Sequence, residues 1–138
     1  MRVVIRSLAA IVGGYGAIMV ITVYGFRVLE KASGFRDWWG TPPPVLLAAT
    51  LVTVIAGLAG GSVAGQVGAF RPVANAALVL IPVTADSTWV FLYYRGSSPK
   101  WFEVLGALTL MACTIAGGFL IELRSRSHHQ QPHTAPSP

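Results

Sequence analysis

The chain has 138 residues, of which 54% are hydrophobic and only 11% are charged, and its mean hydropathy is +0.62. Soluble domains carry about 25% charged residues, so this chain has too few charges to cover a surface that faces water. The net charge of +5 does not indicate nucleic-acid binding, because the basic residues are scattered at the ends of apolar runs.

Four apolar runs follow one another along the chain, and each is long enough to provide the roughly 20 residues that cross a hydrocarbon core. Long continuous runs favour helices, since membrane strands alternate over about ten residues. The sequence therefore predicts an all-α integral membrane protein in which residues 1–126 form a small four-helix bundle. The polar, proline-rich segment 127–138 is predicted to be a disordered tail. The predicted spans are residues 3–26, 44–67, 72–94 and 101–121.

The first run has no charge between Arg6 and Arg27. We expect its helix to project past the membrane through Glu30 and Lys31. Gly34 is the predicted end, because glycine readily adopts the left-handed conformation that terminates helices.

The second run carries glycine at every fourth position, at Gly57, Gly61 and Gly65. Such spacing produces a flat helix face that another helix backbone can approach closely. The sequence leaves open whether the partner helix belongs to the same subunit or to another one. Gly13-Gly14 and Gly117-Gly118 are candidates for the matching faces. All these glycines lie in the half nearer the termini, so we expect the other half to pack more loosely and to hold a small vestibule.

The third run contains one charge, Asp86, nine residues before Arg95. At 1.5 Å per residue it lies about 13 Å inside that boundary. A carboxylate at that depth costs roughly 2.5–3.5 kcal/mol, so it should face the bundle interior or water. Counting nine residues inward from the same side reaches Thr53 and Thr109. The predicted intramembrane polar site consists of Asp86, Thr53, Thr109 and the neighbours Thr84, Ser87 and Thr88.

Two interpretations of Asp86 remain open at this point. In one it handles protons or cations, or contacts a ligand. In the other it makes an interhelical hydrogen bond that fixes packing. Glu103, near the start of the fourth run, is predicted to be structural, because the helix dipole favours an acid in a first turn.

Signatures of enzymes and of cofactor sites are missing from the sequence. It contains no nucleophile elbow, no zinc-protease motif and no phosphate-binding loop. Its single cysteine, Cys113, can form neither an intramolecular disulfide nor a cysteine-cluster metal site. The histidines occur only near the C-terminus. We therefore predict no catalytic residues, no cofactor and no metal.

Basic residues divide five against five between the two sides of a four-span topology. The positive-inside rule is therefore not decisive over the whole chain. We expect the termini to be cytoplasmic, because the basic start at Arg2 and Arg6 precedes the first span.

The end of the second run, AGLAGGSVAGQVGAFRP, together with the apolar run that follows, resembles small uncharacterised four-helix membrane proteins of bacteria. The resemblance implies a multi-pass protein of the bacterial inner membrane and no particular activity. The leading hypothesis is a non-enzymatic accessory subunit or self-associating bundle. Its partners would be the lipid bilayer, other membrane subunits or itself, and not nucleic acid. The alternative is a minimal proton- or cation-coupled transporter or channel that uses Asp86.

Overall fold

The computed structural model describes residues 1–34, 41–93 and 100–129, and their regular secondary structure is entirely α-helical. All four helices are long and apolar enough to cross a membrane. The predicted all-α architecture with four apolar helices is thereby confirmed. The helices are α1 (Arg2–Ser33), α2 (Pro43–Val67), α3 (Pro72–Tyr93) and α4 (Lys100–His129).

Two helix ends differ in how well the sequence predicts them. Gly34 ends α1 as expected, with a φ of 68° and its N–H donating to the Glu30 carbonyl oxygen at 2.9 Å. In contrast, α4 continues to His129, although the tail is predicted to begin at residue 127. An ion pair one turn apart, between Arg126 and Glu122 at 2.6 Å, supports these extra turns. Residues 130–138 of the predicted tail lie outside the described part of the chain.

Helix α2 packs against each of the other three helices, and most closely against α1 and α4. Helix α3 also contacts α1 and α4, whereas no Cα atom of α1 comes within 8 Å of a Cα atom of α4 in the described residues. Every buried residue of α2 is alanine or glycine. Small side chains leave room for helix backbones on several sides, and this explains why α2 can pack against all three.

The Gly57, Gly61 and Gly65 stripe of α2 faces α4 and the start of α3. A Cβ atom added to Gly57 would lie 2.8 Å from the Leu110 carbonyl oxygen, and one added to Gly61 would overlap the backbone of Thr114. At Gly65 the nearest atom would be the Pro72 Cβ, at 3.2 Å. The stripe therefore packs within the chain, which is one of the two arrangements left open by the sequence.

A second small face of α2 meets α1 through a reciprocal glycine contact. A Cβ atom on Gly60 would lie 2.8 Å from the Gly14 carbonyl oxygen, and one on Gly14 would lie 2.9 Å from the Gly60 carbonyl oxygen. Gly118 of α4 similarly approaches α3, 2.9 Å from the Pro72 carbonyl oxygen by the same measure. Gly14 and Gly118 thus belong to interhelical contacts in the half of the bundle nearer the chain termini.

The turn from α2 to α3 is closed by a buried amide. Asn75 donates from Nδ2 to the Phe70 carbonyl oxygen at 2.8 Å and accepts from the Phe70 N–H at 3.2 Å. Its side chain fills the space where a Cβ on Gly68 would otherwise lie. Asn75 is fully buried, so these two hydrogen bonds satisfy polar groups that would be costly to leave unpaired.

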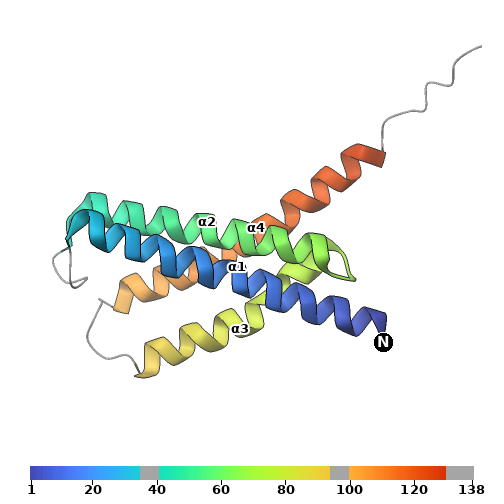
Figure 1. Ribbon diagram of the computed structural model, residues 1–138, viewed down its shortest axis with the longest axis horizontal. Coiled ribbons are helices and arrows are strands. Elements are labelled where there is room, and N and C mark those ends of the chain that lie inside the picture. Colours follow the sequence, from blue (N-terminus) through green and yellow to red (C-terminus); the bar gives the residue numbers. More distant parts are fainter. Residues whose placement is uncertain (35–40, 94–99, 130–138) are drawn as a thin grey trace, which may run out of the picture.

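At the opposite end of the bundle, α3 diverges from α1 and α2 towards its C-terminal end (Figure 1). Helices α1 and α2 stay together there, since a Cβ on Gly25 would meet the side chain of Val52. The space that opens therefore lies on the side of α3 and α4.

A candidate acidic cavity between the four helices

A cavity of about 480 Å³ occupies the end of the bundle where α1 and α3 finish and α2 and α4 begin. All four helices contribute to its walls. It lies in the half for which the sequence predicts looser packing. The glycines that hold the other half together do not line this cavity. Gly106 does line it, and a Cβ atom added to Gly106 would meet no atom within 4 Å, so no helix backbone packs against this glycine.

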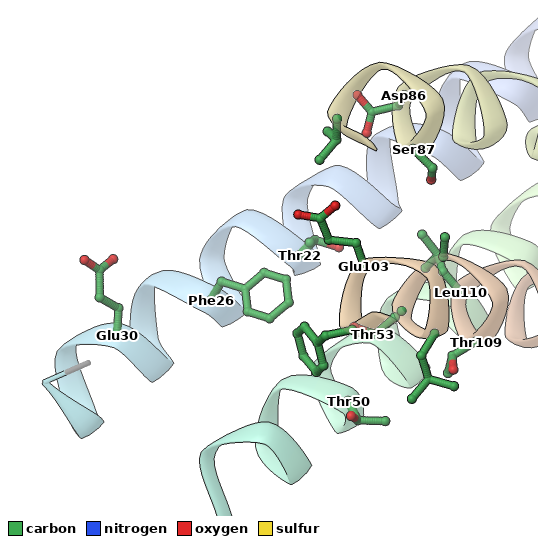
Figure 2. A pocket seen from close by; sticks show the side chains of 15 residues that line it. Thr22, Phe26, Glu30, Thr50, Thr53, Asp86, Ser87, Glu103, Thr109 and Leu110 are labelled. Carbon is green, nitrogen blue, oxygen red and sulfur yellow. The ribbon is translucent and has the colours of Figure 1, made fainter. Parts of the chain in front are cut away.

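Three carboxylates from three different helices line the cavity: Glu30 of α1, Asp86 of α3 and Glu103 of α4. None of the described residues that line the cavity is a lysine, an arginine or a histidine. Figure 2 shows the Glu103 carboxylate extending from α4 towards α3, on which Asp86 and Ser87 lie. Among the described residues, no basic side chain forms an ion pair with Asp86 or Glu30. The cavity wall is therefore electronegative.

Hydroxyl groups form the second polar component of the wall. Thr50 and Thr53 of α2 donate to their own helix, to the carbonyl oxygens of Leu46 at 2.9 Å and Ala49 at 3.0 Å. Because their protons are used in this way, these hydroxyls offer oxygen lone pairs to a ligand. Thr109 and Ser87 line the same cavity, adding two more hydroxyls from α4 and α3.

One buried hydroxyl oxygen in the wall has no hydrogen-bond partner among the described residues. The Oγ1 atom of Thr22 is buried, and nothing in the described part of the chain bonds to it. Buried polar side-chain atoms nearly always have a partner, so an orphaned hydroxyl beside a cavity marks incomplete polar satisfaction at this wall. Figure 2 places Thr22 close to the Glu103 side chain in this view.

Apolar side chains complete the lining. Phe26 of α1 and Phe102 of α4 contribute two aromatic rings, and Val90, Leu105 and Leu110 contribute aliphatic surface. The cavity thus combines negative charge, hydroxyl acceptors and aromatic surface, as small-molecule sites with a few placed polar groups do.

The polar groups occupy three levels along the helix axes. Glu30 and Glu103 each lie three residues from the end of their helix, at a depth of about 5 Å. Asp86 lies seven residues before the end of α3, about 10 Å deep, and Thr53 and Thr109 lie about 14 Å deep. The two glutamates are therefore nearer the helix ends, and Asp86 sits between them and the threonines.

Four of the six predicted polar-site residues line this one cavity: Asp86, Ser87, Thr53 and Thr109. Thr84 and Thr88 do not line it and are exposed, with Thr88 donating to the Thr84 carbonyl oxygen at 2.7 Å. At 3.6 residues per turn, positions two residues either side of Asp86 point about 160° away from it. Neighbours in sequence are thus not neighbours in the site.

Sequence reasoning missed Thr22, Thr50 and Glu30 as site residues, and it gave Glu103 a structural role only. Glu103 does lie in the first turn of α4, but it also lines the cavity. The sequence did contain a signal for Thr22. Counting nine residues inward from Lys31, as was done for the other spans from their own boundaries, reaches Thr22. Thr50 lies one turn before Thr53 on the same helix face.

The carboxylates do not form a chelating cluster. No group of three His, Cys, Asp or Glu residues in the described ranges is arranged to hold a metal ion. Comparisons with protein-family models, with curated proteins and with solved structures found no match. The chemistry of the cavity therefore has to be inferred from its own residues.

Proposed function

We propose that this chain is a multi-pass integral membrane protein that acts as a minimal cation- or proton-coupled transporter or channel. The observation that supports this most is Asp86, an exposed carboxylate that borders a cavity lined by all four helices. It has no basic partner among the described residues, and none of the described lining residues is a cation. An ionisable side chain within an apolar span is costly, and such residues commonly belong to ion or substrate pathways.

The distribution of apolar side chains supports the membrane setting. Large hydrophobic residues are exposed along the outer faces of all four helices, as with Val12, Leu47, Ile81 and Leu108. A monomeric protein in water rarely exposes contiguous apolar surface on that scale. In a bilayer these side chains would face lipid.

The two halves of the bundle suggest how access would be one-sided. The half near the termini is closed by backbone contacts at Gly57, Gly60 and Gly61. The other half holds the cavity. A site at the end of the bundle where α1 and α3 finish, blocked towards the termini by these contacts, corresponds to one state of an alternating-access cycle.

Packing inside the chain weakens the case for an accessory subunit. That hypothesis depended on a glycine face of α2 available to another protein, and Gly57, Gly61 and Gly65 already contact α4 and α3. One observation still favours self-association as a second candidate. Helix α3 exposes three small residues beyond the bulky Ile81, namely Thr84, Ala85 and Thr88, which a second copy could approach closely. Chemical crosslinking in native membranes distinguishes a dimer from a monomer.

Flux through proteoliposomes tests the proposal at Asp86. Asp86→Asn keeps the shape of the side chain and removes its charge, so we expect unchanged thermal unfolding and at least about a tenfold loss of proton or cation flux. Glu122→Gln on α4 is the matched control, because it removes an acid outside the cavity. Full flux in Asp86→Asn would refute the proposal.

The four-span topology is tested by cysteine labelling. In a Cys113→Ala background, single cysteines at Ser33 and Ser127 should react with a membrane-impermeant reagent from opposite sides. We expect position 127 to react from the cytoplasmic side. Reaction of both positions from one side would contradict four spans.

A further inference from the structure

We infer that the ligand of this cavity is an organic ammonium ion with an apolar body, and not an inorganic cation. The inference rests on the proposed function and specifies the substrate class of the same site.

The spacing of the acids argues against an inorganic ion. Calcium and magnesium bind six or more oxygens at about 2.0–2.6 Å, so their ligands must converge on a point. Here the three carboxylates come from three helices and two depths, and no three acidic or other ligating side chains in the described ranges converge. A volume of about 480 Å³ is also in the range of small-molecule sites. The charge is therefore spread over a wall and not focused on one ion.

The electrostatics of the cavity fit a single, bulky positive head group. Figure 2 shows the Glu103 carboxylate of α4 directed towards α3, which carries Asp86 and Ser87. A cationic head placed between α3 and α4 would interact with both carboxylates at once. Because these interactions are distributed, a poorly hydrated ammonium loses less on entering than a strongly hydrated metal ion does.

The remaining wall fits the body that would carry this head group. Phe26 lies on α1 and Phe102 lies on α4, and both rings line the cavity. An ammonium within about 6 Å of an aromatic ring gains about 0.5–2 kcal/mol through the ring quadrupole. Val90, Leu105 and Leu110 provide aliphatic surface for an apolar substituent.

Hydroxyl groups add polar surface to the wall. Thr22 Oγ1 is buried and unpartnered in the described part of the chain, while Thr50 and Thr53 already donate to backbone carbonyls. Thr50 and Thr53 therefore present hydroxyl oxygens whose free capacity is to accept.

Calorimetric titration of the purified full-length chain in detergent tests the inference, with benzyltrimethylammonium as the probe. We expect it to bind at least about tenfold more tightly than tetramethylammonium, which lacks the apolar body. The uncharged isostere neopentylbenzene should not compete, and millimolar Na⁺ or Mg²⁺ should not displace the probe. Glu103→Gln should weaken binding by about tenfold, and Phe26→Leu should weaken it by about threefold. Glu122→Gln should leave it unchanged.

The outcomes separate this inference from the function on which it rests. Binding of Na⁺ or Mg²⁺ that depends on Asp86, with no binding of benzyltrimethylammonium, would overturn the ammonium inference and leave the cation-binding function standing. Probe binding that ignores both Asp86→Asn and Glu103→Gln would place the ammonium outside the cavity and overturn the inference as well. If no cation binds and Asp86→Asn has wild-type flux, both proposals fail. Thermal unfolding of each variant shows that a loss of binding is not a loss of fold.

Discussion

The two halves of this bundle are built from the same four apolar helices and yet pack in different ways. Near the termini, glycines of α2 touch the backbones of α1 and α4, as at Gly60 beside Gly14 and at Gly61 beside Thr114. At the other end the lining residues are acids, threonines and phenylalanines, and about 480 Å³ remains between the helices. The distance between α2 and its neighbouring helices is thus short where α2 carries glycine and longer where it carries larger side chains.

The difference is informative about what holds such helices together. In the proposed membrane setting, lipid tails are as apolar as leucine, so burying an apolar side chain between helices gains little over leaving it in lipid. Association then depends on close backbone contact, which glycine permits. The glycine-packed half can therefore hold the bundle together while the other half stays open enough to contain polar groups.

The largest effect should come from closing the space at Gly61. An added methyl group would overlap the backbone of Thr114, which cannot move aside as a side-chain tip can. We expect Gly61→Ala to lower the free energy of unfolding by about 3 kcal/mol, measured by reversible unfolding in mixed micelles. Gly16→Ala on α1 is the matched control, because nothing lies within 4 Å of its added Cβ. Equal stability of the two variants would show that α2 and α4 are not in backbone contact.

A smaller loss of stability is expected when polar side chains are removed, and it should differ between the two halves of the bundle. Asn75→Ala removes both hydrogen bonds to Phe70 and leaves a void beside Gly68, so we expect a loss of about 1–2 kcal/mol. Ser87→Ala in the cavity removes a hydroxyl that makes no comparable bond, and its cost should stay within about 0.5 kcal/mol. The two variants are compared in the same unfolding assay. A larger cost at Ser87 would mean that the cavity wall is a structural network and not a binding surface.

The sequence was sufficient to predict the helices because length and apolarity set each span, and Gly34 marked the end of α1. It was also sufficient for part of the cavity, because counting residues from a shared boundary aligned Asp86 with Thr53 and Thr109. The sequence did not predict which residues face the cavity, because that depends on how each helix is rotated about its axis. Thr84 and Thr88 are close to Asp86 along the chain but face away from the cavity, and the count alone contains no information on facing.

Glu103 shows a second limit of the sequence. An acid in the first turn of a helix has a sufficient local explanation in the helix dipole, so nothing in the chain near it suggests a site. Its place in the cavity depends on where α3 and α1 lie, which is set by the glycine contacts about 15 Å away along α4. The residues next to Glu103 in the sequence therefore do not predict that it lines the cavity.

The smallest expected effect on stability is also the one that tests the cavity itself. Gly106 of α4 lines the cavity, and an added Cβ there would meet no atom within 4 Å. Alanine is favoured over glycine inside a helix by up to about 1 kcal/mol, so Gly106→Ala should be neutral or slightly stabilising. Gly106→Leu should be tolerated as well, because its side chain can extend into the empty volume.

These two variants should differ in ligand binding, because a leucine side chain occupies space that a ligand needs, whereas an alanine side chain occupies little of it. We expect Gly106→Leu to weaken benzyltrimethylammonium binding by about tenfold or more while its unfolding stays near that of the wild type. A strongly destabilised Gly106→Ala would mean that the helices close over this position and that no cavity exists there. Unchanged binding in a stable Gly106→Leu would instead place the ligand elsewhere, because the added side chain lies in the wall between Glu103 and Thr109, one turn from each.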